Sequence, residues 1–295
     1  MSYYKVLGLD KEPFSTSPDP VFFYSSRGHQ TALTNLIIEL RLRRGLNVIL
    51  GDVGTGKTTL SRKLVQALAE RENFIFHMIF DPTYETEHLF LSSLARIFGL
   101  PVDVNNSSRL DLKDTLEHFL LQKCTQENKT IVLIIDEAQK LEPDTIEVLR
   151  ILLNYETNEY KLLQVVLLGQ LELHSRIMHI PNFIDRISFK YTLNPLDENE
   201  TREMIDFRLK QAGYQGRVTL FQEEAVREIY GATRGYPRQV ARLCHNALKR
   251  MIMQNKAVVD KSTISEIINE EIRQGWMLPV GGVQPAGGVS AGKSA

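Results

Sequence analysis

The sequence contains little of what marks membrane, secreted or disulfide-bonded proteins. Its two cysteines, Cys124 and Cys244, belong to no C-x-x-C pair and no Cys/His cluster, so we expect both to be reduced, partly buried helix residues. The longest apolar runs, such as 131–135, are too short to cross a bilayer. No charged segment followed by an apolar core stands at the N-terminus. These absences predict a cytoplasmic protein without a transmembrane segment.

An excess of charge of one sign is also missing. The 35 Lys and Arg residues nearly balance the 36 Asp and Glu residues, which leaves a formal net charge of −1. The chain therefore has no global basic field for nucleic acid or an acidic membrane, and any such contact must use a local patch. Its 295 residues, 43% of them hydrophobic, have room for about two globular domains, and no internal repeat is evident.

Short apolar segments in the first two thirds of the chain predict five strands, at 46–50, 74–80, 130–136, 162–169 and 187–193. Mostly helical patterns separate them, and a further helix is expected over 29–44, before the first strand. Alternating strands and helices indicate an α/β fold in which a parallel five-stranded sheet carries helices on both faces.

The pattern changes at Asn194-Pro195, after which no strand is predicted. Asp197 and Glu200 form a capping box, and further helices are expected over 221–232, 237–254 and 261–274. We therefore predict four segments: an N-terminal linker at 1–29, a core at 30–195, a small all-helical domain at 196–274 and a flexible tail at 275–295. Aromatic side chains should pin the Pro-rich linker to the body, whereas the Gly-rich tail has too little apolar surface to order itself.

A phosphate-binding loop follows the first predicted strand. It fits the pattern G-x-x-x-x-G-K-[ST] and runs Gly51-Asp52-Val53-Gly54-Thr55-Gly56-Lys57-Thr58. The glycines let successive backbone N–H groups point at phosphate oxygens, and the helix that begins near Lys57 adds its positive end. Lys57 is expected at the β- and γ-phosphates, Thr58 on Mg²⁺ and Thr59 at the α-phosphate. The alternative, a glycine-rich turn with an unrelated lysine, is disfavoured by the strand before it and the helix after it.

A second acidic motif ends the apolar strand 130–136. Ligands in parallel sheets bind at the carboxyl ends of the strands, where Asp136 and Glu137 are placed. Asp136 is predicted to hold Mg²⁺ through its waters, and Glu137 to deprotonate the water that attacks the γ-phosphate. Alone, the pair would fit solvated loop residues equally well, but beside a phosphate loop the catalytic interpretation is favoured.

Three further polar residues are candidates for the same chemistry. Gln170 follows the strand 162–169, where its amide is predicted to sense the γ-phosphate or orient the water, although it could equally be the first residue of a helix. Arg186 and Arg238 are notable cations, because an arginine aimed at a γ-phosphate stabilises the charge of phosphoryl transfer. Most arginines face solvent, so position alone gives neither of them this role.

With these motifs in view, the chain resembles the AAA+ ATPases, and more narrowly the general secretion pathway protein A (ExeA) group. The resemblance spans residues 1 to about 272 and rests, beside the phosphate loop, on Tyr3-Tyr4, Glu12-Pro13-Phe14-Ser15, Ser17-Pro18-Asp19-Pro20, Phe23-Tyr24, Asp136-Glu137-Ala138-Gln139, Leu168-Gly169-Gln170, Arg186-Ile187, Leu196-Asp197, Gly235-Tyr236-Pro237-Arg238 and Leu243-Cys244. It implies a P-loop core with a helical lid, and ATP with Mg²⁺ as cofactors.

The resemblance also implies roles that the residues alone do not establish. The N-terminal segment and the lid would flank the adenine, and Arg238 would contact the γ-phosphate within its own subunit. Arg186 would reach the ATP of a neighbouring subunit, which implies a homo-oligomer with a head-to-tail interface. Secretion members commonly continue into a membrane helix and a periplasmic peptidoglycan-binding module, so this chain resembles a short form that would meet the inner membrane through a partner.

Several settings remain open at this stage. The leading hypothesis is an oligomeric ATPase that supports assembly of a secretion, pilus or exopolysaccharide export system, with envelope-assembly proteins as partners. The alternative is a DNA-binding regulator of the transposition type, as in TniB and TnsC, suggested by the basic residues Arg41, Arg43, Arg44, Arg238, Arg242, Lys249 and Arg250. Such charges are more often a solvated helix face, so nucleic acid is not the favoured partner.

Two other classes of protein share part of this pattern. A DEAH-type helicase would share the Asp136-Glu137 pair but needs a second sheet domain, which the helical patterns after Pro195 do not provide. A nucleotide-gated switch with little turnover would also bind ATP. The presence of Lys57, Asp136 and Glu137 argues against a dead site, though not against a slow one.

Overall fold

The computed structural model describes residues 3–69, 73–101, 103, 106–216 and 218–277, and divides the chain into two compact units. One unit is Ser17–Pro195, and the other combines Met1–Thr16 with Leu196–Ala295. The N-terminal 29 residues, expected as one linker, are thus divided between the units. The last residues of the expected flexible tail, 278–295, lie outside the described ranges.

A parallel five-stranded sheet is the centre of the Ser17–Pro195 unit, as predicted. Its strands lie in the order β2-β3-β4-β1-β5, and every pairing between neighbouring strands is parallel. The strands are β1 (Leu46–Gly51), β2 (Phe74–Ile79), β3 (Thr130–Ile135), β4 (Leu163–Gly169) and β5 (Ile187–Leu193). Because all five run the same way, the residues that follow β1, β3 and β4 meet at one edge of the sheet.

Side chains of the central strands are buried on both faces of the sheet, which explains their uninterrupted apolar runs. Successive residues of β3 alternate between two hydrophobic clusters: Ile131, Leu133 and Ile135 join one, and Val132 and Ile134 join the other. The second cluster also contains buried residues of α2 and α3, whereas the first contains those of α4 to α8. The sheet therefore supports a helical layer on each side.

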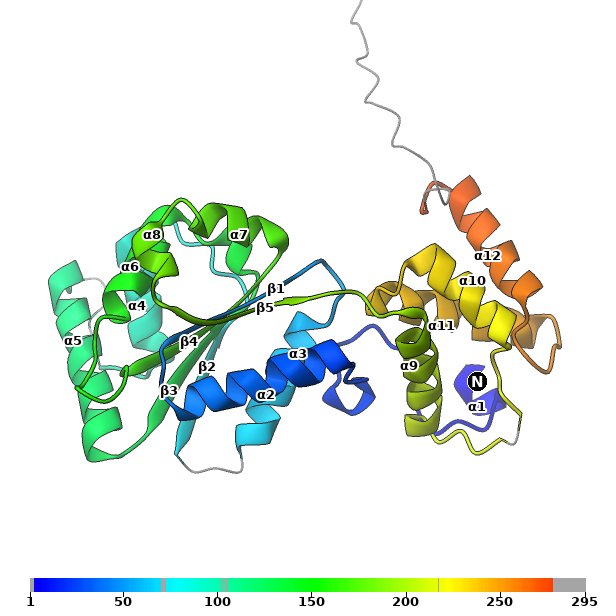
Figure 1. Cartoon of the computed structure of the whole chain (residues 1–295), viewed down its shortest axis with the longest axis horizontal. Helices are drawn as coiled ribbons and strands as arrows, with labels where there is room; N and C mark the ends of the chain where they lie inside the picture. The colour runs from blue at the N-terminus through cyan, green and yellow to red at the C-terminus, as the bar shows by residue number, and fades with distance from the viewer. Residues whose placement is uncertain (1–2, 70–72, 102, 104–105, 217, 278–295) are drawn as a thin grey trace, which may run out of the picture. The chain divides into compact units, whose positions relative to one another are not determined.

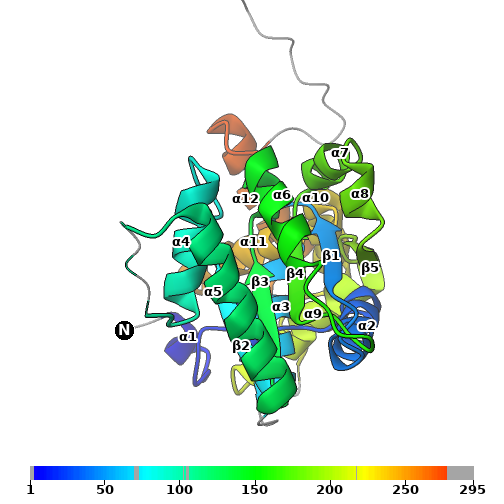
Figure 2. The same ribbon diagram turned by 90° about the vertical axis from the view of Figure 1, so that its left-hand side faces the viewer.

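These layers are visible as separate groups of helices. Figure 1 shows α2 and α3 along one face, and Figure 2 shows α4, α5 and α6 side by side over the other. The unit contains η1 (Pro20–Phe22), α2 (Arg27–Arg41), α3 (Lys57–Ala69), α4 (Glu87–Ile97), α5 (Arg109–Leu121), η2 (Gln122–Gln126), η3 (Ala138–Lys140), α6 (Pro143–Leu152), α7 (Leu171–Ile177) and α8 (Pro181–Ile184).

The other unit is helical. It contains α1 (Tyr3–Val6), α9 (Glu198–Gln211), α10 (Glu223–Thr233), α11 (Pro237–Met253) and α12 (Lys261–Arg273). The expected capping box starts α9: the Asp197 side chain accepts from the Glu200 N–H, and the Glu200 side chain accepts from the Asp197 N–H. An isolated bridge between Phe221 and Val259 is the only β-type pairing among the described residues of this unit.

The N-terminal segment packs onto these helices through an aromatic ring and backbone carbonyls. The Phe14 ring is 1% exposed and meets Phe221 edge to face, with 5.8 Å between ring centroids. The Arg208 guanidinium donates to the Ser15 carbonyl at 3.0 Å, and the Asp10 N–H donates to the Ala212 carbonyl at 2.8 Å. Phe14 and these backbone contacts therefore hold residues 10–15 against the helical unit.

None of the helices in the described part of the chain combines the length and the apolar character that crossing a bilayer requires. Both cysteines are unpaired and buried, Cys124 in the π-helical turn η2 and Cys244 in α11. Gly275 and Trp276, at the start of the expected tail, still bond to the end of α12 through their backbone N–H groups.

Gly235 provides a test of the helical unit, because its backbone has φ +73° and a Cβ there would lie 1.8 Å from the Leu196 carbonyl oxygen. We expect Gly235→Ala to lower the free energy of unfolding by about 3 kcal/mol or more, since it adds a clash to a left-handed conformation. Urea unfolding followed by the fluorescence of the single tryptophan, Trp276, measures this loss.

Gly231→Ala is the matched control. Gly231 lies inside α10, and a Cβ there would meet nothing within 4 Å. Alanine is the better helix former, so this variant should gain about 0.5–1 kcal/mol. Equal effects of the two substitutions would contradict the close packing of Gly235 against Leu196.

Candidate functional site

The predicted phosphate loop joins the end of β1 to the start of α3. Thr55 closes the turn, because its hydroxyl donates to the Asp52 carbonyl at 2.9 Å and its N–H donates to the same oxygen at 3.3 Å. Gly56 has φ +99°, a conformation that side chains disfavour, and a Cβ there would lie 3.0 Å from the His29 ring. The first N–H groups of the 13-residue helix α3 therefore open directly onto this loop.

Lys57 extends back over the loop that precedes it. Its ammonium donates to the Gly51 carbonyl at 2.7 Å and to the Asp52 carbonyl at 3.0 Å. Burial lowers the pKa of Lys57, and the negative charges of Asp136 and Glu137 oppose that shift. The loop thus holds a largely buried cation beside open backbone N–H groups, an environment suited to an anion.

Thr58 and Asp136, far apart in sequence, meet at the edge of the sheet. The Thr58 hydroxyl donates to Asp136 Oδ2 at 2.6 Å, and the Glu137 N–H donates to Asp136 Oδ1 at 2.9 Å. Asp136 is 4% exposed, so both of its carboxylate oxygens have defined positions. The two residues predicted to hold Mg²⁺ are therefore in direct contact, and their hydroxyl and carboxylate oxygens are of the hard type that Mg²⁺ prefers.

Glu137 follows in a conformation that is uncommon for a residue with a side chain. Its φ of 51° and ψ of 34° lie in the left-handed region, which costs roughly 1–2 kcal/mol. The Gln139 amide donates to Glu137 Oε2 at 2.6 Å. Such strain commonly persists where the surrounding structure imposes a functional geometry.

Gln170 reaches the same corner with its backbone. It is the N-cap residue of α7, and its N–H donates to Gln139 Oε1 at 3.0 Å. Its side chain makes no capping bond. Gln139 thus links Gln170 to Glu137. Gln139 belongs to the motif Asp136-Glu137-Ala138-Gln139, but its place in that motif does not indicate this link.

His29 is another residue that the sequence analysis missed. It is 1% exposed, and its Nε2 lies 2.8 Å from the Thr55 carbonyl, so Nε2 carries the proton. Nδ1 then accepts from the Ser26 hydroxyl at 2.7 Å. Phe23 packs edge to face on the ring, with 4.9 Å between centroids. The start of α2 thereby supports the phosphate loop. No sequence pattern indicates this role, because His29 and Thr55 come together only in the folded chain.

Arg186 lies far from the phosphate loop of its own chain. It precedes β5, whose first residue, Ile187, pairs with Leu46 at the start of β1, whereas Leu193 pairs with Gly51 at its end. At about 3.3 Å per residue, the six-residue strand β1 separates the two positions by roughly 20 Å.

Local contacts hold the Arg186 guanidinium at that opposite edge. It donates to Asn154 Oδ1, from Nε at 3.1 Å, and to the Asn182 carbonyl. Arg238, by contrast, stands in the first turn of α11 in the helical unit, after the N-cap Tyr236 and Pro237.

Within the described ranges, no group of three or more His, Cys, Asp or Glu side chains is placed to hold a metal ion. A metal at the Thr58–Asp136 contact would therefore take most of its ligands from water and a bound anion. This is the usual arrangement for Mg²⁺ in phosphate sites.

Comparisons with known proteins identify relatives of the chain and of its fold. A family model for the AAA domain matches residues 40–177. General secretion pathway protein A of Aeromonas hydrophila is 36% identical over 248 residues, which are 83% of this chain. The chain spans 44% of the length of that protein.

Solved structures share the fold at low sequence identity. The ORC2 protein of Aeropyrum pernix, in ADPNP and ADP complexes, matches with a TM-score of 0.64 and 18% identity over 88% of this chain and 72% of its own. Cdc6p of Pyrobaculum aerophilum gives 0.66 and 18%, over 85% and 70%. The RuvB branch migration motor of Thermotoga maritima gives 0.57 and 16%, over 85% and 73%. The chain therefore has the AAA+ P-loop fold of the AAA+ ATPases, and most of its length resembles general secretion pathway protein A.

Proposed function

We propose that the chain binds Mg-ATP at the carboxyl edge of its sheet and hydrolyses it with water activated by Glu137. The observation that carries this proposal is the 2.6 Å contact between Thr58 and Asp136. It joins the loop after β1 to the end of β3, across β4, and so assembles two separate motifs into one site. This assembly is what a magnesium-dependent P-loop ATPase needs.

The phosphates would be held by residues of the loop itself. The backbone N–H groups of residues 51–58 and the positive end of α3 would receive phosphate oxygens, with Thr59 close to the α-phosphate. Lys57 would exchange its two carbonyl contacts for the β- and γ-phosphates. A bound Mg²⁺, held by Thr58 and by Asp136 through water, supplies charge neutralisation between those phosphates.

Glu137 is proposed as the general base. It directly follows Asp136, the proposed Mg²⁺ ligand, and its N–H donates to the Asp136 carboxylate. It would accept the proton of the attacking water as the water oxygen bonds to the γ-phosphorus. The bond from the γ-phosphorus to the β–γ bridging oxygen would break, and ADP would leave. Gln170 adjoins the same corner, where its side chain is proposed to orient the water or contact the γ-phosphate.

Arginine would come from two places. Arg186 lies roughly 20 Å from the phosphate loop of its own chain, at the other end of β1. We therefore propose that it completes the site of a neighbouring copy in a head-to-tail oligomer. Arg238 is proposed to contact the γ-phosphate of its own subunit, by resemblance to lid arginines. Hydrolysis would then depend on subunit contacts, and ATP and ADP states would favour different oligomer arrangements.

The resemblance to general secretion pathway protein A supports a place for this cycle in envelope transport. We propose that the oligomer assists assembly of a secretion, pilus or exopolysaccharide export system, with envelope-assembly proteins as partners. The match covers less than half of the relative, so this role rests on the shared ATPase part alone.

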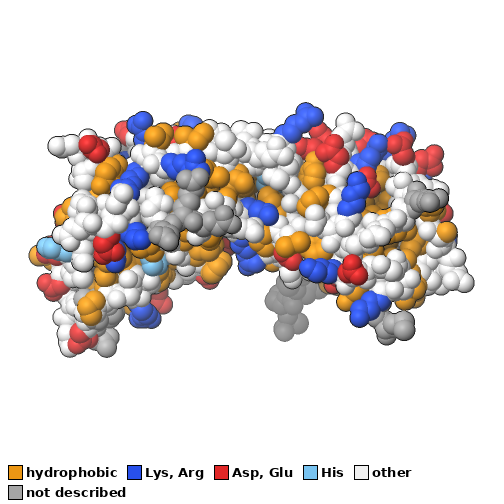
Figure 3. All heavy atoms as spheres, turned by 90° about the horizontal axis from the view of Figure 1, so that it is seen from below, with side chains coloured by type: hydrophobic (Ala, Val, Ile, Leu, Met, Phe, Trp, Pro, Cys, Tyr) orange, Lys and Arg blue, Asp and Glu red, His pale blue; other side chains and the backbone are white. Residues whose placement is uncertain are grey.

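A DNA-binding regulator is the less favoured alternative, although some structures with the same fold were solved with DNA. On the face shown in Figure 3, Lys and Arg side chains alternate with Asp and Glu side chains. Arg43 is engaged with Thr130, Asn128 and the Tyr160 ring. A duplex would have to compete with such contacts.

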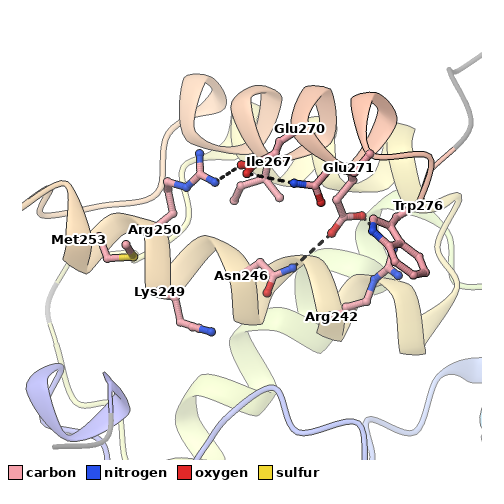
Figure 4. Close-up of a pocket in the computed structure, with 10 residues that line it drawn as sticks. Arg242, Asn246, Lys249, Arg250, Met253, Ile267, Glu270, Glu271 and Trp276 are labelled. Carbon is pink, nitrogen blue, oxygen red and sulfur yellow. Dashed lines mark hydrogen bonds and ion pairs between the residues drawn. The ribbon is translucent and has the colours of Figure 1, made fainter.

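Two basic residues of α11, Arg242 and Arg250, are similarly engaged within the helical unit. Figure 4 shows the groove between α11 and α12, where Arg242 pairs with Glu271 at 2.9 Å and Arg250 pairs with Glu270. Acidic side chains of α12 thus neutralise two of the candidate basic residues. The groove itself has a volume of about 320 Å³ and is rimmed by Trp276 and Met253.

The first test removes the proposed base. Glu137→Gln should lower kcat for ATP by at least about 100-fold, because an amide cannot accept the proton of water, while the Kd for ATP changes less than about threefold. Phosphate release and isothermal titration calorimetry measure the two quantities. Glu142→Gln is the matched control, because Glu142 is exposed and its side chain makes no capping bond. Parental turnover in Glu137→Gln would refute the assignment.

A mixing experiment tests the trans role of Arg186. Alone, Arg186→Ala should lower kcat about 10³-fold or more. Mixed with Glu137→Gln, it should recover turnover. The Arg186→Ala chains keep Glu137, and the Glu137→Gln chains supply the missing arginine to them. Exposed Arg109→Ala serves as control. If the mixture stays as inactive as its components, while light scattering shows them assembled together, Arg186 has no such role.

The support of the loop by His29 can be tested separately. His29→Ala removes the bonds to Thr55 and Ser26, so we expect the Kd for ATP to rise about tenfold, corresponding to about 1.4 kcal/mol. Calorimetry measures the affinity, and thermal unfolding confirms that the variant is folded. His118→Ala, an exposed histidine on α5, should leave the Kd unchanged. An unchanged Kd for folded His29→Ala would contradict the proposed support.

A further inference from the structure

The Gln139 side chain links Glu137, which follows β3, to Gln170, which follows β4. Its Nε2 donates to Glu137 Oε2 at 2.6 Å, and its Oε1 accepts from the Gln170 N–H at 3.0 Å. Gln139 lies in the short turn η3 after β3, whereas Gln170 follows β4 and begins α7. One amide thus spans the ends of two neighbouring strands.

The chemistry of the two partners fixes the orientation of this amide. The Gln170 N–H can only donate, so it requires the amide oxygen, and a carboxylate at Glu137 can only accept, so it requires the amide nitrogen. The flipped amide would place like partial charges together at both ends. Each contact therefore supports the other, and loss of one weakens the hold on the second.

Glu137 depends on this amide for its side-chain direction. Its backbone is already held, since the N–H donates to Asp136 Oδ1 at 2.9 Å and φ is 51°. The remaining freedom is rotation of the side chain, and the Gln139 contact restricts it. The carboxylate is half-buried, so this bond is only partly exposed to competition from water.

We propose that Gln139 is a positioning residue that orients the Glu137 carboxylate for proton abstraction and couples it to the Gln170 peptide. The proposal rests on the hydrolytic function assigned above. A shift of the Gln170 N–H, near which the γ-phosphate is expected, displaces the amide oxygen of Gln139. The amide nitrogen of Gln139 moves with it and displaces the Glu137 carboxylate. Occupancy of the γ-phosphate position is thereby transmitted to the residue that activates water.

The test separates orientation of the base from binding of the nucleotide. Gln139→Leu keeps much of the side-chain volume and removes both hydrogen bonds, so kcat should fall about 10–100-fold while the Kd for ATP stays within about twofold. Gln139→Glu retains an acceptor for Gln170 but places a second carboxylate at Glu137, so kcat should fall at least as far. Lys140→Ala, in the same turn and exposed, should keep the parental kcat.

A double-mutant cycle shows whether Gln139 acts through Glu137. In the Glu137→Ala background, single-turnover hydrolysis of radiolabelled ATP should be no slower when Gln139→Leu is added, because the group that it orients is gone. An unchanged kcat for Gln139→Leu, a loss of ATP affinity equal to the loss of kcat, or a full additional loss in the Glu137→Ala background would each overturn the proposal.

Failure of this inference differs from failure of the proposed function. If the proposed function is wrong, the parental chain itself hydrolyses no ATP under conditions in which it is folded. If only this inference is wrong, the parental chain hydrolyses ATP and Glu137→Gln still stops it, while Gln139→Leu leaves the rate or the coupling unaffected.

Discussion

The hydrogen bond between the Thr58 hydroxyl and the Asp136 carboxylate is the contact on which the candidate site depends. Thr58 lies in the first turn of α3, which follows β1, and Asp136 directly follows β3. In the sheet, β4 separates β1 from β3. Their meeting requires all three strands to end at the same edge, which in turn requires parallel strands of matched register. The doubly buried sheet and the proposed chemistry thus share one geometric requirement.

Much of the fold could be predicted from the sequence. Buried parallel strands need apolar side chains on both faces, so the runs at 46–50 and 130–136 marked β1 and β3 to within one residue. Capping residues, as at Asp197 and Glu200, and apolar periodicity predicted the helices after Pro195. The phosphate loop was equally visible, because its chemistry depends on residues that are consecutive in the chain.

The contacts that support the site were less predictable, because they join residues distant in sequence. His29 reaches Thr55 across 26 positions and Gln139 reaches Gln170 across 31, and neither side chain belongs to a pattern that signals this. The division of the N-terminal segment was hidden for the same reason, since the carbonyl of Ser15 meets Arg208 only in the folded unit. The specific catalytic roles of Glu137, Gln170, Arg186 and Arg238 stay predictions.

Arg186 lies at the start of β5, opposite the phosphate loop, and this location affects how many nucleotide sites in an oligomer can be active. If each arginine completes the site of the next copy, an incomplete ring of copies, or open arc, always has one terminal nucleotide site that no arginine reaches. Activity per chain then climbs as the arc lengthens and reaches its ceiling only on ring closure. A partner that caps the terminal copy, or severs the ring, would control hydrolysis without touching ATP.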